Sequence, residues 1–226
     1  KQSLKKHIEK NKAFEYPRNG VLDEIAAVWE GKSRDLIRKE FKKYAYNESW
    51  NEIMQKNEYW KFDSLAEHVA IIKLCVELNI CGYIIGFPGA CKSFSTKVIE
   101  KECKDLEIAT YMCARDVSSE SLLMLFKDVA YKKKGGSKVL IIIEEIGIAN
   151  LSKSTPLKVL HDLLENGVLI YYNGEYERVK IPTIAISNYA LDYANGSRGI
   201  ILFTELFSKE ELMNTFQYKI KGIFYK

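Results

Sequence analysis

Residues 86–93 read Gly-Phe-Pro-Gly-Ala-Cys-Lys-Ser and match the phosphate-binding pattern G-x-x-x-x-G-K-[ST], except at Cys91, where glycine is usual. A strand pattern precedes this segment and a helix pattern follows it, so backbone N–H groups and the positive end of the helix dipole can surround a polyphosphate. Lys92 would reach the β- and γ-phosphates, and the Ser93 hydroxyl would be a Mg²⁺ ligand. The residues predicted to bind the nucleotide are Gly86, Pro88, Gly89, Ala90, Cys91, Lys92, Ser93 and Phe94.

Cys91 leaves two other interpretations of this segment open. One is a chance Gly-x-Pro-Gly turn before a helix, and the other is a redox or nucleophilic role for the thiol. If the position requires a left-handed backbone, the Cβ atom of Cys91 costs about 1–2 kcal/mol. The strand before the segment, the helix after it and a second motif downstream favour the phosphate loop.

That second motif is a pair of carboxylates, Glu144 and Glu145, directly after the most apolar strand pattern of the chain, Val139–Ile143. Open α/β sheets bind their ligands at the carboxyl ends of their strands. In this Walker B arrangement the first carboxylate holds Mg²⁺, usually through water, and the second polarises the attacking water. Aspartate is commoner at the first position. A pair of exposed loop acids is the alternative, and the strand that ends at the pair argues against it.

Two further polar residues lie next to strand patterns. One follows a strand pattern and the other precedes one. Asn188 comes after the pattern Thr183–Ile186 and could bind the γ-phosphate or position the water beside Glu145, although Ser187-Asn188 alone would also suit a turn or a helix cap. Arg198, before the apolar run Ile200–Phe203, could contact a neighbour's γ-phosphate as an arginine finger. A surface arginine in a glycine-rich turn is an equally good interpretation of the sequence alone.

The elements that would position these residues alternate between strand and helix, which predicts a parallel sheet covered on both faces. Strands are expected at Tyr83–Ile85, Ile108–Met112, Val139–Ile143, Thr183–Ile186 and Ile200–Phe203, and helices at about 92–104, 119–132 and 156–165. Pro156 suits the first helical position after a cap at Ser154 or Thr155. Asn173-Gly174 predicts a two-residue type I′ turn between Val168–Tyr172 and Glu175–Ile181. Residues 1–80 have helical patterns.

Composition excludes several classes of protein. The 226 residues carry a net charge of +4, too mild to indicate nucleic-acid or membrane-surface binding by itself, and the hydrophobic content of 47% excludes wholesale disorder. Five cysteines without paired spacing favour a reducing compartment, predicted to be the cytoplasm, over a disulfide framework or a zinc site. No apolar run approaches the ~20 residues of a transmembrane helix. The chain begins without Met, so processing or a longer parent chain is expected.

The order of phosphate loop, acidic strand, helix, hairpin, Asn-ended strand and Arg resembles the large subdomain of an AAA+ ATPase of the dynein and MoxR-like branch. Within that branch the chain is most similar to the mysterin family, giant AAA+ proteins with a RING-type E3 ubiquitin ligase region. The stretches that carry the resemblance are Leu74–Leu78, Gly86–Ser93, Pro156–Gly167 and Ile186–Asp192 with Arg198–Ile200. This family also tolerates a non-glycine residue before the loop lysine.

The resemblance implies a P-loop NTPase sandwich of three layers, with a pre-sensor-1 hairpin and with ATP and Mg²⁺ as cofactors. It gives the catalytic roles to Glu145, Asn188 and Arg198 and the metal-binding roles to Ser93 and Glu144. The expected organisation is a helical extension at 1–63, the ATPase subdomain at 64–207 and the start of a lid at 208–226. Neighbouring AAA+ modules are the expected partners, and ubiquitin machinery would act through domains outside this sequence, which has no clustered Cys and His for a RING.

ATP hydrolysis is the leading functional prediction. A module that binds nucleotide without hydrolysing it is the alternative, favoured by Cys91, Glu144 and the short lid. A nucleic-acid-dependent motor is a weaker alternative, because the lysine run at 132–134 is short and no basic groove with interleaved aromatics is visible.

Overall fold

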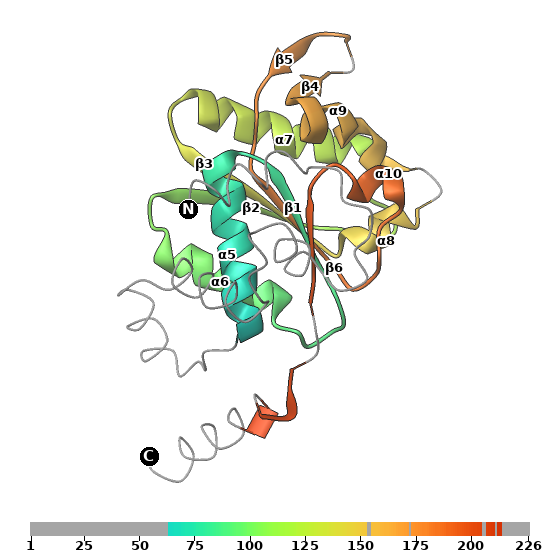
Figure 1. The fold of residues 1–226 in the computed structure, drawn as a ribbon. Helices are drawn as coiled ribbons and strands as arrows, with labels where there is room; N and C mark the ends of the chain where they lie inside the picture. Colours follow the sequence, from blue (N-terminus) through green and yellow to red (C-terminus); the bar gives the residue numbers. More distant parts are fainter. Residues whose placement is uncertain (1–62, 153–154, 172, 205–206, 211, 214–226) are drawn as a thin grey trace, which may run out of the picture.

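The computed structural model describes residues 63–152, 155–171, 173–204, 207–210 and 212–213 (Figure 1). The helices predicted before residue 63 lie outside this part, as does most of 208–226, so the predicted domain boundaries stay predictions. The elements are α5 (Asp63–Leu78), β1 (Cys81–Ile85), α6 (Lys92–Glu102), β2 (Leu106–Met112), α7 (Ser119–Lys134), β3 (Lys138–Glu144), α8 (Ile146–Asn150), the 3₁₀ helix η1 (Pro156–Leu160), α9 (His161–Asn166), β4 (Val168–Ile170), β5 (Tyr176–Arg178), β6 (Thr183–Ser187), α10 (Tyr193–Gly196) and β7 (Ile200–Phe203).

Five of these strands form one parallel sheet in the order β2-β3-β6-β1-β7. In β1, Ile85 pairs with Ser187 of β6 and with Phe203 of β7. Because all five strands run in the same direction, their carboxyl ends lie together at one edge of the sheet. The segments that follow β1, β3 and β6 therefore meet at this edge, which confirms the predicted α/β fold and the predicted parallel sheet.

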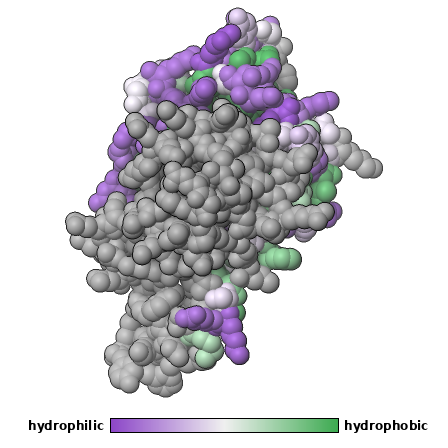
Figure 2. Space-filling view, viewed as in Figure 1, coloured by the Kyte–Doolittle hydropathy of each residue, from purple (hydrophilic) through white to green (hydrophobic). Residues whose placement is uncertain are grey.

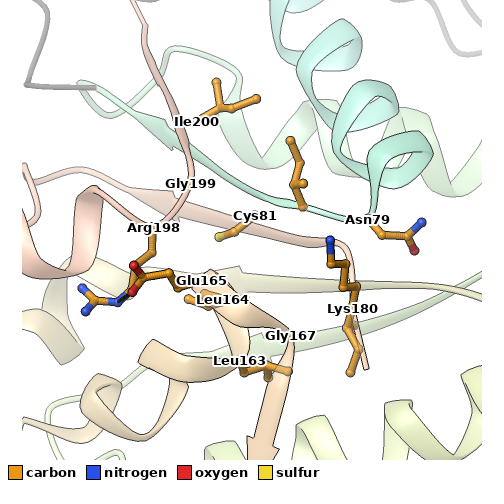
Figure 3. A pocket seen from close by; sticks show the side chains of 12 residues that line it. Asn79, Cys81, Leu163, Leu164, Glu165, Gly167, Lys180, Arg198, Gly199 and Ile200 are labelled. Carbon is orange, nitrogen blue, oxygen red and sulfur yellow. Dashed lines mark ion pairs between the residues drawn. The ribbon is translucent and has the colours of Figure 1, made fainter. Parts of the chain in front are cut away.

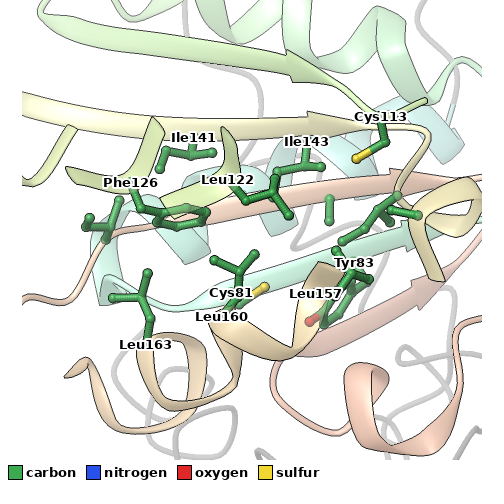
Figure 4. Packing of buried hydrophobic residues seen from close by; sticks show 14 of the residues in the cluster. Cys81, Tyr83, Cys113, Leu122, Phe126, Ile141, Ile143, Leu157, Leu160 and Leu163 are labelled. Carbon is green, nitrogen blue, oxygen red and sulfur yellow. The ribbon is translucent and has the colours of Figure 1, made fainter. Parts of the chain in front are cut away.

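Strand residues alternate between two helical layers, as the two-residue period of a strand requires. One cluster packs the strands against α5 and α6 and includes Ile84, Ile142 and Leu202. The other packs them against α7, α8, η1 and α9, where Ile141 and Phe126 meet (Figure 4). Full burial of one such side chain contributes about 1.5–3 kcal/mol. The two clusters make the three-layer arrangement visible in Figure 1.

The helix α7 shows how local sequence sets an element's ends. Ser118 caps it by accepting a hydrogen bond from the Ser121 N–H at 3.1 Å. Glu120 lies in the first turn and lysines 132–134 lie in the last, where each charge suits the helix dipole. The predicted helix at 119–132 is confirmed and continues for two more residues.

Two local predictions were wrong. The segment predicted as one helix at 156–165 is a 3₁₀ helix followed by α9. Its N-cap, Thr155, has φ 45° and makes no side-chain cap bond. The predicted two-residue type I′ turn is a three-residue loop, because Tyr171 N–H donates to Glu175 O at 2.8 Å and Gly174 N–H donates to Tyr171 O at 3.0 Å. Gly174, with a left-handed φ of 83°, occupies the last position of this loop, where a three-residue hairpin loop requires a left-handed residue.

The β4–β5 hairpin stands apart from the main sheet, beside α9 and α7 (Figure 1). The surface around it is mainly hydrophilic in Figure 2. Glu177 of β5 pairs with Lys134 of α7 and accepts a hydrogen bond from Tyr171 at 2.6 Å. The hairpin is therefore attached to α7 by polar contacts, and it precedes β6 in the chain as predicted.

Candidate nucleotide-binding site

The predicted phosphate loop leaves β1 at the carboxyl edge of the sheet and enters α6 at Lys92. Cys91, the N-cap of α6, has φ 56° and ψ 22°, so this position is left-handed, and Gly89 also has a positive φ of 86°. A non-glycine residue pays about 1–2 kcal/mol for this conformation. Pro88 and Gly89 are exposed, whereas Ala90 is buried. The chain thus keeps a glycine-like loop conformation despite the cysteine.

The ammonium of Lys92 lies at the centre of the site. Its Nζ donates to Gly86 O at 2.7 Å, to Phe87 O at 2.8 Å and to Asn188 Oδ1 at 2.8 Å, which engages all three donors. Burial lowers the pKa of Lys92, and the carboxylates of Glu145 and Glu144 oppose that shift. The lysine therefore lies over its own loop as a desolvated cation between acidic and amide groups.

Ser93 and Glu144 form the second pair of the site. The Ser93 hydroxyl donates to Glu144 Oε2 at 2.7 Å, across 51 positions of the chain. The Glu144 side chain is buried at the end of β3. A hydroxyl and a carboxylate oxygen held this close are hard ligands of the kind Mg²⁺ takes, usually together with phosphate oxygens and waters. The hydroxyl and carboxylate oxygens of Ser93 and Glu144 therefore fit this ion.

Glu145 and Asn188 complete the arrangement. Asn188 Nδ2 donates to Glu145 Oε1 at 2.9 Å while Asn188 Oδ1 accepts from Lys92. These two bonds orient the Asn188 amide, with its oxygen toward Lys92 and its nitrogen toward Glu145. Glu145 has φ 56° and ψ 34°, a strained backbone that costs about 1–3 kcal/mol and that occurs most often at functional sites. The segments after β1, β3 and β6 are thus joined by one chain of polar contacts.

Close packing at Gly86 and Gly147 holds these segments in place, and the sequence did not indicate it. A Cβ at Gly86 would lie 1.8 Å from Thr204 Oγ1, and a Cβ at Gly147 would lie 2.3 Å from Ser187 Oγ. The loop therefore sits directly on the end of β7, and α8 sits directly on the end of β6. The phosphate-loop pattern names Gly86 but not its contact with Thr204, and no pattern marks Gly147, so only the structure reveals this packing.

The sequence patterns also gave no reason to assign a role to His68 of α5. It is completely buried, and neither ring nitrogen makes a full hydrogen bond in the described part of the chain. Burial, together with the nearby charge of Lys92, lowers the pKa of His68 to about 3, and a contact with the Cys91 backbone opposes this shift. The imidazole is therefore neutral and supports the loop from the side of α5. Phe94 is half-buried against the same core cluster.

Arg198 lies beside Glu165 of α9, in a pocket that contains none of the other predicted site residues (Figure 3). It precedes β7, so it lies at the amino edge of the sheet, where its Nε is 3.5 Å from Glu165 Oε2 of α9. Only 18% of its side chain is exposed. In its own chain Arg198 is not part of the cluster around Lys92.

Comparison with known proteins agrees with this geometry. A family model described as the RNF213 AAA domain matches residues 60–211. The chain belongs to the RNF213 AAA-domain family. This finding confirms the resemblance to the mysterin family. The chain is 31% identical over 169 residues to the E3 ubiquitin-protein ligase rnf213-beta of Danio rerio, and 28% identical over 188 residues to the E3 ubiquitin-protein ligase RNF213 of Mus musculus.

These alignments cover 67% and 71% of this chain but 3% and 4% of the two relatives, so the chain matches a small part of each. Among solved structures, the RuvB Holliday junction branch migration motor of Thermotoga maritima is similar in fold. Its TM-score is 0.51 at 13% identity, and the match covers 71% of this chain and 50% of that one. At this identity the likeness shows the fold alone, which is that of an AAA+ module.

Three further findings concern metal clusters, membrane-spanning helices and cysteines in the described residues. These residues include no cluster of three or more His, Cys, Asp or Glu that could hold a metal ion by themselves. Within the same residues, every helix is too short or too polar to cross a bilayer. All five cysteines lie in the described part, as free thiols.

Proposed function

We propose that this chain is an ATP-binding and ATP-hydrolysing AAA+ module of a larger, mysterin-like E3 ubiquitin ligase. The observation that carries the proposal is the chain of hydrogen bonds Lys92–Asn188–Glu145, with Ser93–Glu144 beside it. These groups come from three separate segments, and a cation, an amide and two carboxylates are the groups that phosphoryl transfer to water requires.

Each group has a role in this proposal. The loop amides and Lys92 bind the β- and γ-phosphates, and Ser93 and Glu144 would hold Mg²⁺, which neutralises charge on the phosphates when bound. Glu145 accepts the proton of the attacking water, and Asn188 orients that water or the γ-phosphate. To bind phosphate, Lys92 must give up its hydrogen bonds to the loop carbonyls. Bonds to negatively charged phosphate oxygens replace them.

The partners are neighbouring AAA+ modules of the parent chain, one of which would receive Arg198 at its nucleotide. Its place at the amino edge, remote from its own Lys92, supports a role toward a neighbour. Ubiquitin transfer would belong to other domains of the parent. The free thiols of all five cysteines support a cytoplasmic location.

The identity of the bound nucleotide tests this proposal. The full-length parent would be incubated with radiolabelled ATP and Mg²⁺, separated from free nucleotide, and compared with Glu145→Gln. We expect bound ADP in the wild type and retained ATP in the variant, while Glu100→Gln, an exposed acid on α6, behaves as wild type. Retained ATP in both proteins would instead support the module that binds without hydrolysis. The absence of bound nucleotide in all three would overturn the proposal.

A further inference from the structure

Asn195 makes side-chain or backbone hydrogen bonds to three other elements. Its Nδ2 donates to Oδ1 of Asn150, the last residue of α8, at 2.7 Å. Its Oδ1 lies 2.9 Å from Nε2 of His161, the first residue of α9, which must donate because the amide oxygen can only accept. Its backbone oxygen accepts from the Tyr83 hydroxyl of β1 at 2.8 Å. One residue of a four-residue helix thus joins α8, α9 and the sheet.

The α8 end of this junction begins at the candidate site. Glu145 is the N-cap of α8, and Asn150 is its last residue. Gly147 leaves no space between α8 and the end of β6, which carries Asn188. Five helical residues span about 7 Å. The short helix α8 is thus a direct connection between Glu145 and Asn150, and it is packed closely against the end of β6.

The other end of the junction is the segment that carries Arg198. Gly199 is pinned against β1, since a Cβ there would lie 2.7 Å from the Cys81 oxygen. Arg198 therefore lies between this fixed glycine and the end of α10, three residues after Asn195. Its ion-pair partner, Glu165, lies on α9, the helix whose first residue also bonds Asn195. Asn195 therefore holds both the arginine segment and the helix of its acidic partner.

We propose that Asn150 and Asn195 are positioning residues that transmit the state of the candidate nucleotide site to Arg198. The inference rests on the proposed function, and it names the route by which one module's nucleotide would affect the arginine offered to the polyphosphate of the next. A single neutral hydrogen bond limits the coupling to about tenfold.

Asparagine chemistry gives a matched pair of variants. Asn150 takes part in the junction through its carbonyl oxygen, so Asn150→Asp keeps the acceptor and Asn150→Ala removes it. Asn150 is half-buried at a helix end, and neither variant introduces a larger side chain. Asn195→Ala would remove all three side-chain bonds of this residue, to Asn150, His161 and Asp192, and is the more severe variant.

Hydrogen exchange measured by mass spectrometry on the full-length parent tests the proposal. The probe is the non-hydrolysable analogue adenylyl imidodiphosphate with Mg²⁺. Peptides over 86–93 report binding. Peptides over 192–199 report the arginine segment through the Gly196 and Ser197 amides, which donate to Asp192 O and Tyr193 O. Unchanged exchange over β2 and an unchanged melting temperature show that a variant is folded.

In the wild type we expect the analogue to slow exchange at 86–93 and to change it at 192–199. Asn150→Ala should keep the first effect and reduce the second severalfold, and Asn150→Asp should restore it. An equal response at 192–199 in Asn150→Ala, or no response there in the wild type despite protection at 86–93, would overturn the inference alone. No protection at 86–93 in the wild type would overturn the proposed function itself.

Discussion

The two edges of the sheet hold cavities of the same size but differ in how their polar groups are connected. At the carboxyl edge, Tyr189 and Arg115 line a cavity of about 470 Å³. At the amino edge, Lys73 and Lys138 line another of about 470 Å³. Cavity volume therefore does not distinguish the two edges. The arrangement of their charged groups does.

At the amino edge two lysines pair with carboxylates. Lys73 pairs with Glu102 at 2.6 Å, and Lys138 pairs with Asp105. At the carboxyl edge, by contrast, Lys92 is bonded to an amide and to backbone carbonyls while two carboxylates lie near it. Matched pairs suit stability, whereas an unneutralised cluster on strained backbone suits a ligand that completes it.

Removal of the Asn188 amide should lower turnover strongly while the loop at 86–93 stays intact. Asn188→Ala breaks the contact between Lys92 and Glu145, and loss of one preorganised polar group costs about 10²–10³ in turnover. Phosphate release by the full-length parent is the measurement. Asn166→Ala, an exposed asparagine of α9 on the other side of the molecule, is the control. If both variants hydrolyse at the wild-type rate, the carboxyl edge is not the reactive one.

Lys92→Ala should weaken nucleotide binding by about 10–100-fold, the usual range for one hydrogen-bonded charge. Titration with a fluorescent ATP analogue measures the affinity. Lys97→Ala removes an exposed lysine from the same helix and should leave affinity unchanged. Equal affinity in the two variants would contradict the assignment of the loop.

Cys91→Gly should raise thermal stability, because glycine adopts φ 56° without the strain of about 1–2 kcal/mol. The added conformational entropy of the unfolded chain opposes this gain by about 0.5–1 kcal/mol, so the net gain lies between about 0 and 1.5 kcal/mol. Cys103→Gly is the matched control, since Cys103 has φ −102° and gains nothing from glycine. Calorimetry should show opposite signs for the two changes. A loss of stability in Cys91→Gly would show that the thiol's packing outweighs the strain.

The smallest effect is expected at the amino edge. Lys138 lowers the pKa of Asp105 below its usual 3.8, so the pair contributes stability above that pH and loses it as the pH falls through the lowered pKa. Asp105→Asn should therefore reduce stability slightly at neutral pH and converge with the wild type in acid. Denaturant unfolding at several pH values measures the difference, which should be small because the pair is fully exposed. A large change in turnover would mean that this edge is more than structural.

Sequence reasoning located the strands that position the site because each has a clear apolar run followed directly by polar groups. Val139–Ile143 with Glu144 is the strongest example, and β3 has those residues at its end. The glycine that is usual at position 91 raised the question of a left-handed backbone, and Cys91 has one at φ 56°. Because each strand pattern is followed directly by polar groups, the sequence predicts both the fold and the grouping of these polar residues at the carboxyl edge.

Contacts between segments could not be predicted in the same way. The seating of Gly147 on Ser187, the neutral His68 behind the loop and the Asn195 junction all join residues far apart in the chain. Loop length in the β4–β5 hairpin depended on which residues pair across it, and Asn-Gly alone does not fix that. The pairing of Arg198 with Glu165 likewise depends on how α9 packs, which no periodicity records.

Phosphate release by the full-length parent with Glu145→Gln tests the central claim most directly. Removal of a general base costs about 10²–10⁴ in the rate at its site. The account predicts that Glu145→Gln lowers phosphate release to the level of Lys92→Ala while ATP affinity, unlike that of Lys92→Ala, stays near wild type. Phosphate release equal to wild type, with ATP bound, would contradict it.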